Sequence, residues 1–460
     1  MARLLCFVLL LFSSPLLIVI YILFLRSPLP LPDVDVDAWW GAGEETKQNT
    51  SVRSFEVQFS ASMIQDLKKR LKNHRKWTPP LEDIGFEYGF NTEQLDSWVS
   101  YWSDKYNFQE RERFFNKFPQ FKTNIQGLDI HFIRVQPEVS GMEIVPMLFL
   151  HTWPGSVREI YEALPLLTAV RDDQDFAIEA IVPSWPGCGF SDAPVRPGLG
   201  LAGMAVVLRN LMHRLGFKKF YLQGGDIIGI TLATLFPQEV LGFHSNVGAS
   251  ASTSAILLNL IGAWLPSFVV EPHLADRMYP LSSTFGFLLE ESGYVHLQAT
   301  KPDTLGKAAV PILGVSDSPV GLLAYILEKF STWTKNEYKR LPDGGLDKHW
   351  SKDQLLDNLM CYWATNSFTT SVSVYAEIFS KRQIEFQLDE IPTPVPTWII
   401  QAKNELIFQP WRILRRKFPN LVHANAIDDG GHFLAFQLPK VFSDDVLKAI
   451  AAFRKLKREN

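Results

Sequence analysis

The sequence holds little cysteine and little excess charge. Its 460 residues include three cysteines, Cys6, Cys188 and Cys361, too few for a disulfide framework and without the paired spacing of a metal site. A net charge of −4 removes any argument for a nucleic-acid partner. The motif G-x-S-x-G is absent, which disfavours a serine hydrolase built on that motif.

What is present is typical of a folded protein with an ample core. Hydrophobic residues make up 47% of the chain, aromatic residues 13% and charged residues 20%. A chain of 460 residues accommodates one large domain or two smaller ones. The basic runs Lys68-Lys69-Arg70 and Arg415-Arg416-Lys417 are interpreted as solvated helix faces.

A long apolar run opens the chain. Residues 4–25 contain no charged side chain, and about 20 apolar residues suffice to cross a bilayer. We expect an uncleaved transmembrane anchor there, because no A-x-A cleavage signal follows. The proline-rich residues 26–41 predict a juxtamembrane linker. It ends in Trp39-Trp40-Gly41, which fits either a membrane interface or packing on the domain.

Four further segments are expected after the linker. Residues 42–120 are predicted to be mostly helical, with a helix start at Ser60 and another at Asn91. Residues 121–249 alternate strand-like and helix-like stretches, which favours a parallel α/β sheet. Residues 250–390 interrupt this alternation and are interpreted as a helical cap, and residues 391–460 resume it.

Short apolar runs mark the strands. The pair Gln126-Gly127 separates two strand-like stretches and predicts a hairpin. Buried parallel strands are expected at the continuous runs 147–150, 178–182, 220–223, 243–247 and 397–401.

Three residues in a fixed chain order indicate a catalytic site. Asp226 follows a strand-like run and Gly224-Gly225, and precedes a helix-like stretch. Glu405 comes just after the predicted strand 397–401, and His432 follows Gly430-Gly431 near the C-terminus. Nucleophile, acid and histidine in this order are typical of the α/β-hydrolase fold. An aspartate nucleophile indicates attack on an alkyl carbon, as in epoxide opening or dehalogenation.

Each of these residues also has an ordinary structural interpretation. Asp226 fits a helix N-cap, and His432 fits a surface-loop histidine. Glu405 fits an exposed loop carboxylate, and Asp389 and Glu390 are weaker rivals for the supporting acid. The chain order and the combination of the three favour the catalytic interpretation.

An oxyanion hole is expected beside the nucleophile. The sequence His151-Thr152-Trp153-Pro154-Gly155 follows the strand that ends at Leu150. A backbone N–H there, assigned to Trp153, would pair with the N–H of Ile227 to hold an oxyanion. An ordinary strand-ending turn is the alternative.

These residues resemble the microsomal and juvenile-hormone epoxide hydrolases along almost the whole chain. Specific matching stretches are Thr78-Pro79-Pro80-Leu81-Glu82-Asp83, Gly127-Leu128-Asp129-Ile130-His131-Phe132, Trp153-Pro154-Gly155-Ser156, Thr300-Lys301-Pro302-Asp303-Thr304 and Glu328-Lys329-Phe330-Ser331-Thr332-Trp333-Thr334. The resemblance implies an α/β-hydrolase fold with an inserted helical cap, an N-terminal meander and an N-terminal transmembrane helix. It also implies a single-pass protein of the endoplasmic reticulum or microsomal membrane with a cytosolic catalytic domain.

The same resemblance implies a reaction. Asp226 is the nucleophile, His432 the base, Glu405 the acid that orients it, and Tyr294 and Tyr375 the donors to the epoxide oxygen. The expected substrates are lipophilic epoxides, either juvenile-hormone-like terpenoids or xenobiotics, and the product is a vicinal diol. No metal or organic cofactor is required.

The chain departs from that family at three places. Thr152 stands where the family usually has glycine, and Ile227-Ile228-Gly229 follows the nucleophile directly where the family has Trp-Gly-Ser first. The stretch 308–315 is longer than the corresponding link. Two alternatives therefore stay open: a catalytically impaired lipid-binding protein of the same fold, and a haloalkane dehalogenase.

Overall fold

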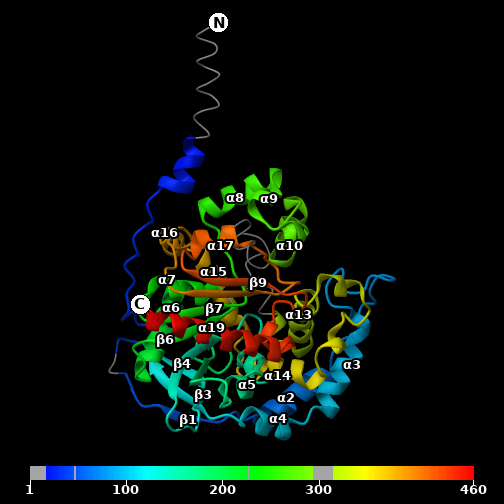
Figure 1. Cartoon of the computed structure of the whole chain (residues 1–460). Coiled ribbons are helices and arrows are strands. Elements are labelled where there is room, and N and C mark those ends of the chain that lie inside the picture. Colours follow the sequence, from blue (N-terminus) through cyan, green and yellow to red (C-terminus); the bar gives the residue numbers. More distant parts are fainter. Residues whose placement is uncertain (1–16, 46–47, 226, 294–313, 460) are drawn as a thin grey trace.

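The computed structural model describes residues 17–45, 48–225, 227–293 and 314–459. Its strands are β1 Arg53–Phe55, β2 Gln120–Ile125, β3 Leu128–Val135, β4 Glu143–Leu150, β5 Phe176–Pro183, β6 Phe220–Gly224, β7 Val240–Ser245, β8 Thr397–Gln401 and β9 Leu421–Ala426. They form a single nine-stranded sheet in the order β1-β2-β3-β5-β4-β6-β7-β8-β9. Figure 1 shows this sheet in the body of the molecule.

The sheet is mixed, whereas the alternation of strands and helices predicted a parallel one. Strands β1, β2, β3 and β5 pair antiparallel, and every pairing from β5 through β4, β6, β7 and β8 to β9 is parallel. The predicted hairpin between β2 and β3 explains the antiparallel part. Its turn residues Gln126 and Gly127 both have positive φ, of 52° and 85°, the geometry of a tight hairpin turn.

Helices surround the sheet in the part of the chain that the structure describes. They are α2 Ala61–Lys72, α3 Leu95–Ser100, α4 Phe108–Phe115, α5 Leu164–Thr168, α6 Leu201–Arg214, α7 Ile227–Leu235, α8 Thr253–Trp264, α9 Pro266–Val269, α10 Leu281–Glu291, α13 Pro319–Thr332, α14 Lys352–Trp363, α15 Phe368–Ile378, α16 Lys381–Glu385, α17 Trp411–Lys417, α18 Leu434–Gln437 and α19 Pro439–Glu459. Short 3₁₀ turns include η4 Val157–Ile160, η5 Pro272–Arg277 and η8 Leu388–Glu390. All eight residues of β5 are buried, because helices cover both faces of the sheet's centre.

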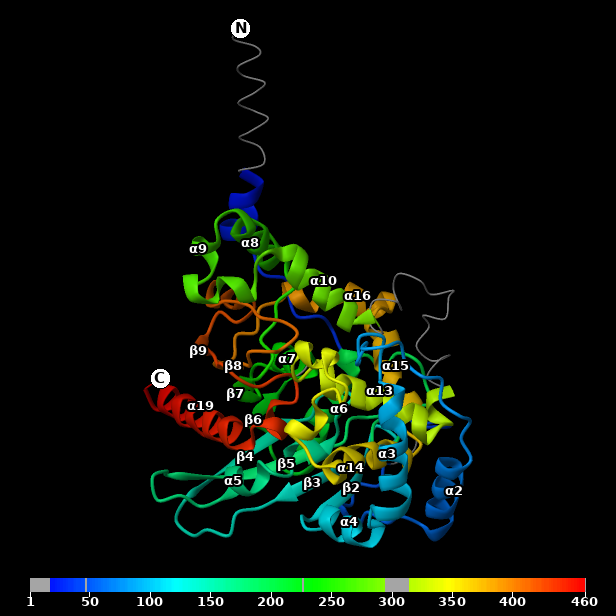
Figure 2. The same cartoon turned by 90° about the vertical axis from the view of Figure 1, so that its right-hand side faces the viewer.

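The predicted helix start at Ser60 is confirmed. The Ser60 side chain accepts a hydrogen bond from the backbone N–H of Met63 and caps α2. Leu67 and Leu71 on the inner face of α2 are fully buried. Helices α2, α3 and α4 lie at the end of the molecule opposite α8 and α9, as both views show (Figures 1 and 2).

The single-pass membrane prediction is wrong. Among the residues that the structure describes, no helix is both long enough and apolar enough to cross a bilayer. The described part of the expected anchor, Leu17 to Leu25, is helical. Residues 4–16 of the expected anchor lie outside the described residues. The Arg416 guanidinium donates to the carbonyl of Leu23 over 2.7 Å, and the buried Leu23 packs beside Ala255 and Leu258.

The aromatic residues after the linker pack on the domain. The backbone N–H of Trp40 donates to the carbonyl of Gln126 over 2.9 Å, and the Trp40 side chain is buried. Gly41 lies against Gly127 so closely that a Cβ at either position would meet the other's backbone within 3 Å. Of the two interpretations of this segment, packing is therefore the observed one.

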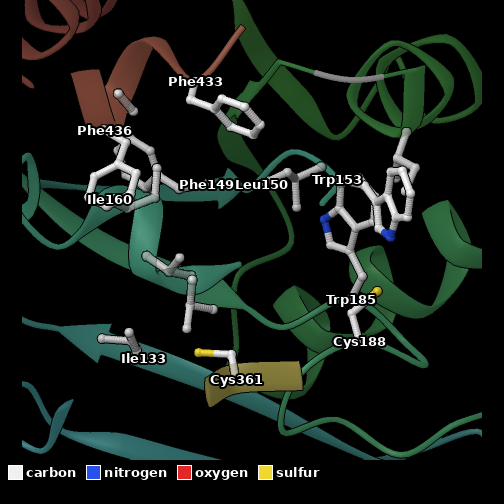
Figure 3. Close-up of a cluster of buried hydrophobic side chains, with 14 of the residues drawn as sticks. Ile133, Phe149, Leu150, Trp153, Ile160, Trp185, Cys188, Cys361, Phe433 and Phe436 are labelled. Carbon is white, nitrogen blue, oxygen red and sulfur yellow. The ribbon is translucent and has the colours of Figure 1, made fainter. Parts of the chain in front are cut away.

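A large apolar core joins the sheet, the N-terminal helices and helices α13, α14 and α15, which lie between β7 and β8 in the sequence and are called the cap helices below. Figure 3 shows part of it, including Ile133 on β3, Cys361 on α14 and Phe433 before α18. Cys188 and Cys361 are both buried and unbridged. Burial raises the pKa of the Cys361 thiol to about 12, so this cysteine is an inert core residue.

One buried ion network ties three parts of the chain together. The carboxylate of Asp357 on α14 is fully buried. It accepts from Arg158 Nε over 3.0 Å and from Arg111 Nε over 2.8 Å, and the Tyr106 hydroxyl donates to it over 2.9 Å. The cap helix, the N-terminal helices and the loop after β4 therefore share one charge cluster.

Removing that carboxylate should destabilise the whole fold. Asp357→Asn leaves the buried Arg158 and the partly buried Arg111 without their shared counter-charge, so we expect a loss of about 3 kcal/mol in the free energy of unfolding. Urea unfolding followed by fluorescence measures it. Asp173→Asn breaks the exposed pair with Arg171 and should leave the free energy of unfolding almost unchanged, because water screens that pair. Equal losses in the two variants would contradict the role of the buried cluster.

Candidate functional site

Parallel pairing brings four loops to one edge of the sheet. Strands β4, β6, β8 and β9 all run in the same direction, so the chain leaves each of them at the same side. The loop after β4 carries Trp153, the chain after β6 enters α7 at Ile227, and Glu405 and His432 follow β8 and β9. The carboxyl edge of such a sheet is where ligands bind in α/β folds.

Glu405 and His432 form a hydrogen-bonded pair. His432 Nδ1 lies 3.0 Å from Glu405 Oε1, and both residues are 8% exposed. Because Nδ1 faces a carboxylate, the neutral imidazole carries its hydrogen on Nδ1 and its lone pair on Nε2. A histidine in this tautomer can accept a proton at Nε2.

Backbone hydrogen bonds hold the two loops against each other. The N–H of Lys403 donates to the carbonyl of Asp429 over 3.1 Å, and the N–H of Asn404 donates to the carbonyl of Gly430 over 2.9 Å. Gly430 has a φ of 81°, a conformation that glycine adopts without strain. The spacing between Glu405 and His432 therefore follows from paired backbone and not from the side chains alone.

Trp333, the residue that caps helix α13, contacts His432 in two ways. The His432 N–H donates to the Trp333 carbonyl over 2.9 Å, and the two rings meet edge to face with centroids 5.0 Å apart. A Cβ at Gly431 would lie 2.4 Å from the same carbonyl. Only glycine permits this close approach of the two backbones.

Asp389 and Glu390, the weaker candidates for the acid that supports the histidine, lie in a different segment from Glu405. Asp389 and Glu390 belong to η8. Glu390 pairs with Arg26 over 2.9 Å and accepts from the Thr253 N–H over 2.7 Å. The structure therefore brings Glu405 to His432, and it engages Glu390 with the segment that precedes the domain.

The turn between β6 and α7 depends on small residues for a reason that sequence reasoning missed. Neither Gly224 nor Gly225 has a positive φ, so glycine is not needed for backbone conformation. Instead, a Cβ at Gly225 would lie 2.5 Å from the Asn246 side chain, and one at Gly224 would lie 3.2 Å from the Gly229 Cα. Gly229 thus lets α7 approach β6 closely, while Ile228 is buried.

The structure describes three of the predicted catalytic residues, Glu405, His432 and Tyr375, and not the other two. Asp226 and Tyr294 lie outside the described residues, as does most of the stretch 308–315. Ile227 begins α7 and is 48% exposed.

Trp153 and Tyr375 lie together. Trp153 is buried and its ring meets the Tyr375 ring edge to face, with centroids 5.0 Å apart. The Trp153 Nε1–H donates to Ser371 Oγ over 3.0 Å. Because Ser371 and Tyr375 both belong to α15, the cap helix and the loop after β4 are joined at this point.

The unusual Thr152 has a specific partner. Its N–H donates to Glu159 Oε1 over 3.1 Å, and its hydroxyl lies 3.0 Å from each oxygen of the same buried carboxylate. The threonine hydroxyl thus adds a hydrogen bond that glycine at this position cannot make. Glu159 also fills the space beside Gly155, where a Cβ would overlap its carboxylate.

Helix α14 holds the same loop from the other side. Asn358 Nδ2 donates to the Pro154 carbonyl over 3.0 Å, and Asn358 Oδ1 accepts from Ser156 Oγ over 2.8 Å. The Tyr362 hydroxyl donates to the Gly155 carbonyl. No local sequence pattern indicates Glu159, Asn358 or Tyr362, because their role arises from contacts across more than one element.

His151, the first residue of this loop, is structural. Its Nδ1 donates to the Thr152 carbonyl over 2.8 Å, and its Nε2 accepts the Trp185 N–H over 3.3 Å. Its ring stacks on Trp185 with centroids 4.6 Å apart. Complete burial lowers the pKa of His151 to about 4, so the ring stays neutral near pH 7.

This histidine should make the fold acid-sensitive. The unfolded chain binds its proton near pH 6.5, whereas the folded chain does so only near pH 4. The neutral ring's contribution is therefore complete above pH 6.5 and is lost as the pH falls towards 4, by up to about 3 kcal/mol. Unfolding free energies at several pH values should show a shallower acid decline in His151→Asn than in the parent chain. Identical declines would contradict this.

Family models match both halves of the chain. A model described as the N-terminus of epoxide hydrolases matches residues 52–160, and one described as the alpha/beta hydrolase fold matches residues 145–439.

Similar proteins cover nearly the whole chain. Juvenile hormone epoxide hydrolase of Bombyx mori is 56% identical over 98% of both chains. Epoxide hydrolase 1 of Sus scrofa is 40% identical over 90% of this chain and 92% of its own. The crystal structure of the silkworm juvenile hormone epoxide hydrolase superposes with a TM-score of 0.89, at 57% identity over 92% of this chain and all of that chain. On these grounds, and with the sheet and loops described above, the chain belongs to the epoxide hydrolase family of α/β-hydrolase enzymes.

Proposed function

We propose that this enzyme converts lipophilic epoxides to vicinal diols through an ester formed on Asp226. The observation that supports this best is the hydrogen bond between His432 and Glu405 at the sheet edge where β6 ends. A histidine in that position can activate water against an ester formed at the start of α7.

In the first step the Asp226 carboxylate attacks one carbon of the epoxide ring. That carbon's bond to the ring oxygen breaks as the ester bond forms. Tyr294 and Tyr375 donate hydrogen bonds to the ring oxygen, and one of them supplies the proton that makes it a hydroxyl. The buried position of Tyr375 beside Trp153 suits an apolar substrate.

In the second step water hydrolyses the ester. His432 Nε2 takes a proton from water, and the resulting hydroxide attacks the carbonyl carbon of the ester. The backbone N–H groups of Trp153 and Ile227 stabilise the oxyanion. The acyl–oxygen bond then breaks as the added hydroxyl gives its proton to the leaving oxygen, which releases the diol and restores the Asp226 carboxylate. The proton held on His432 returns to the tyrosine that lost one in the first step. Glu405 stabilises the imidazolium formed on the way.

The substrate class is drawn from similar proteins and from the aromatic surroundings of the site. Relatives in Bombyx mori and Ctenocephalides felis are named for juvenile hormone. Around Trp153 stand the rings of Phe368, Tyr325 and Tyr375. We therefore propose terpenoid epoxides of the juvenile-hormone kind first, with xenobiotic epoxides as further substrates.

Replacing the nucleophile should abolish the reaction. Asp226→Asn removes the attacking carboxylate, so we expect diol formation from a terpenoid epoxide to fall by at least about a thousandfold. The parent enzyme should show the mass of the covalent ester after a single turnover. In the presence of ¹⁸O-labelled water, repeated turnover should place the label in Asp226.

Assays of the parent enzyme with an epoxide and with a chloroalkane separate the proposed function from the two alternatives. Tight binding of the epoxide without ester or diol would support a lipid-binding protein of the same fold. Halide release from a chloroalkane would support a dehalogenase. The side chain of Ile227 offers no hydrogen-bond donor for a halide, which favours epoxide opening. Unchanged diol formation in Asp226→Asn would refute the proposal.

Loosening the loop Pro154–Ser156, which follows the oxyanion donor Trp153, should slow turnover without weakening the binding of substrate. Asn358→Leu keeps the branched shape of the side chain but removes both bonds to the Pro154–Ser156 loop. A displacement of about 1 Å costs on the order of a hundredfold in rate, so we expect kcat to fall about tenfold to a hundredfold with KM little changed. Asn210→Leu is the matched control, because Asn210 donates to the Val36 carbonyl. A normal kcat in Asn358→Leu would contradict the loop's role.

A further inference from the structure

Glu291, at the end of α10, is a buried carboxyl with no cationic partner. It is 6% exposed. Its Oε2 accepts from Thr332 Oγ1 over 2.8 Å and from Trp333 Nε1 over 2.9 Å. Within the part of the chain that the structure describes, no lysine, arginine or histidine lies within ion-pair distance of it. The charged side chains that influence it are Glu328 and Lys329 of α13.

This placement is costly in three ways. Burial disfavours the charged carboxylate and raises its pKa, and the nearby Glu328 adds like-charge repulsion. Glu291 is also the last residue of α10, where the helix dipole disfavours negative charge. An apolar side chain would fill this position at lower cost. Its two hydrogen bonds therefore indicate a role other than stability.

One of these two bonds comes from Trp333, the residue that contacts His432, and the other comes from Thr332 just before it. Trp333 caps the C-terminus of α13. It contacts His432 through its carbonyl, which accepts the His432 N–H, and through its indole ring, which meets the imidazole edge to face. Because Glu291 binds the indole Nε1–H, the orientation of that ring is fixed from the side of α10.

We propose that Glu291 is a positioning residue for the histidine base. Its hydrogen bond sets the indole of Trp333, and the indole confines the imidazole of His432 so that Nδ1 stays on Glu405. The imidazole is then held by Glu405 at one edge and by the Trp333 ring beside it. Glu291 acts through Trp333 and touches no reacting atom.

This role rests on the proposed function and predicts a selective defect. His432 takes its proton from water only in the second step, whereas the first step uses Asp226 and the tyrosine donors. Loss of Glu291 should therefore slow ester hydrolysis and leave ester formation largely intact. A purely structural role would weaken both steps together or lower stability alone.

The test compares variants that remove or keep the hydrogen bond between Glu291 and the Trp333 indole. Glu291→Leu removes the acceptor, Glu291→Gln keeps a carbonyl oxygen for both donors, and Trp333→Phe keeps a ring but removes the indole N–H. Glu290→Gln is the control. The Glu290 carboxylate, one residue before Glu291, is exposed and lies 3.8 Å from the Lys339 ammonium. Rapid quench with a terpenoid epoxide, followed by intact mass, gives the rates of ester formation and hydrolysis.

In Glu291→Leu we expect hydrolysis to slow at least about tenfold, with the ester accumulating, because a small misplacement of the base is costly. Ester formation should change less than about threefold. Glu291→Gln should stay within about threefold of the parent enzyme in both steps. Trp333→Phe should resemble Glu291→Leu, and the double variant should be no slower than either, because both remove the same bond.

Titration of His432 in ¹⁵N-histidine-labelled protein tests the inference without turnover. The ring nitrogen shifts of His432 should move in Glu291→Leu and stay unchanged in Glu290→Gln. Unchanged shifts together with normal ester hydrolysis in Glu291→Leu would overturn the positioning role. Equal slowing of both steps would also overturn it. Absence of ester and diol in the parent enzyme would instead refute the proposed function, whatever the histidine shifts show.

Discussion

The parallel hydrogen bonds among β4, β6, β7, β8 and β9 are the constraint on which the site depends. They send the chain out of four strands at one edge, so that residues far apart in sequence arrive in neighbouring loops. Trp153 and Ile227 stand where the adjacent strands β4 and β6 end, and Glu405 and His432 where the adjacent strands β8 and β9 end. Loops on a rigid parallel sheet can vary in sequence while the positions they start from stay fixed.

The cap helices do more than cover that edge, because each of three helices holds a different part of it. Helix α14 binds the Pro154–Ser156 loop through Asn358, and α15 binds Trp153 through Ser371. The end of α13 binds His432 through the Trp333 carbonyl. The buried carboxylate of Asp357 then fastens α14 to the N-terminal helices and to Arg158. Cap, core and N-terminal helices thus share polar contacts inside one apolar core.

Thr152 and Gly229 show how the chain accommodates its departures from the family it belongs to. The Thr152 hydroxyl is satisfied by the Glu159 carboxylate, which also receives the backbone N–H of that residue. Gly229 of helix α7 lies against Gly224 at the end of β6, so α7 packs closely on that strand although Ile228 is bulky. A buried polar group is tolerated when it is paired, and a helix approaches a strand closely when one residue lacks a side chain.

The sequence by itself determined the strands, the hairpin and the order of the candidate residues. Continuous apolar runs predicted β4, β5, β6 and β8, because a strand buried on both faces has no polar side to display. The positions of Glu405 and His432 after successive strands were predicted as well, since strand ends are visible in the pattern. The catalytic roles of these residues stay predictions. The prediction of a single-pass membrane protein was wrong, because no helix among the described residues is both long and apolar enough to cross a bilayer.

Only the tertiary structure decided which side chains hold the site in place. Glu159, Asn358 and Glu291 carry no local signal, since each acts on a residue brought near by folding and not by spacing along the chain. The reason for Gly225 was likewise hidden, because the side chain that excludes a Cβ there belongs to Asn246, just past the next strand. The spacing of apolar residues indicates which face of one segment is buried. A contact between two segments depends on where both of them lie in the folded protein.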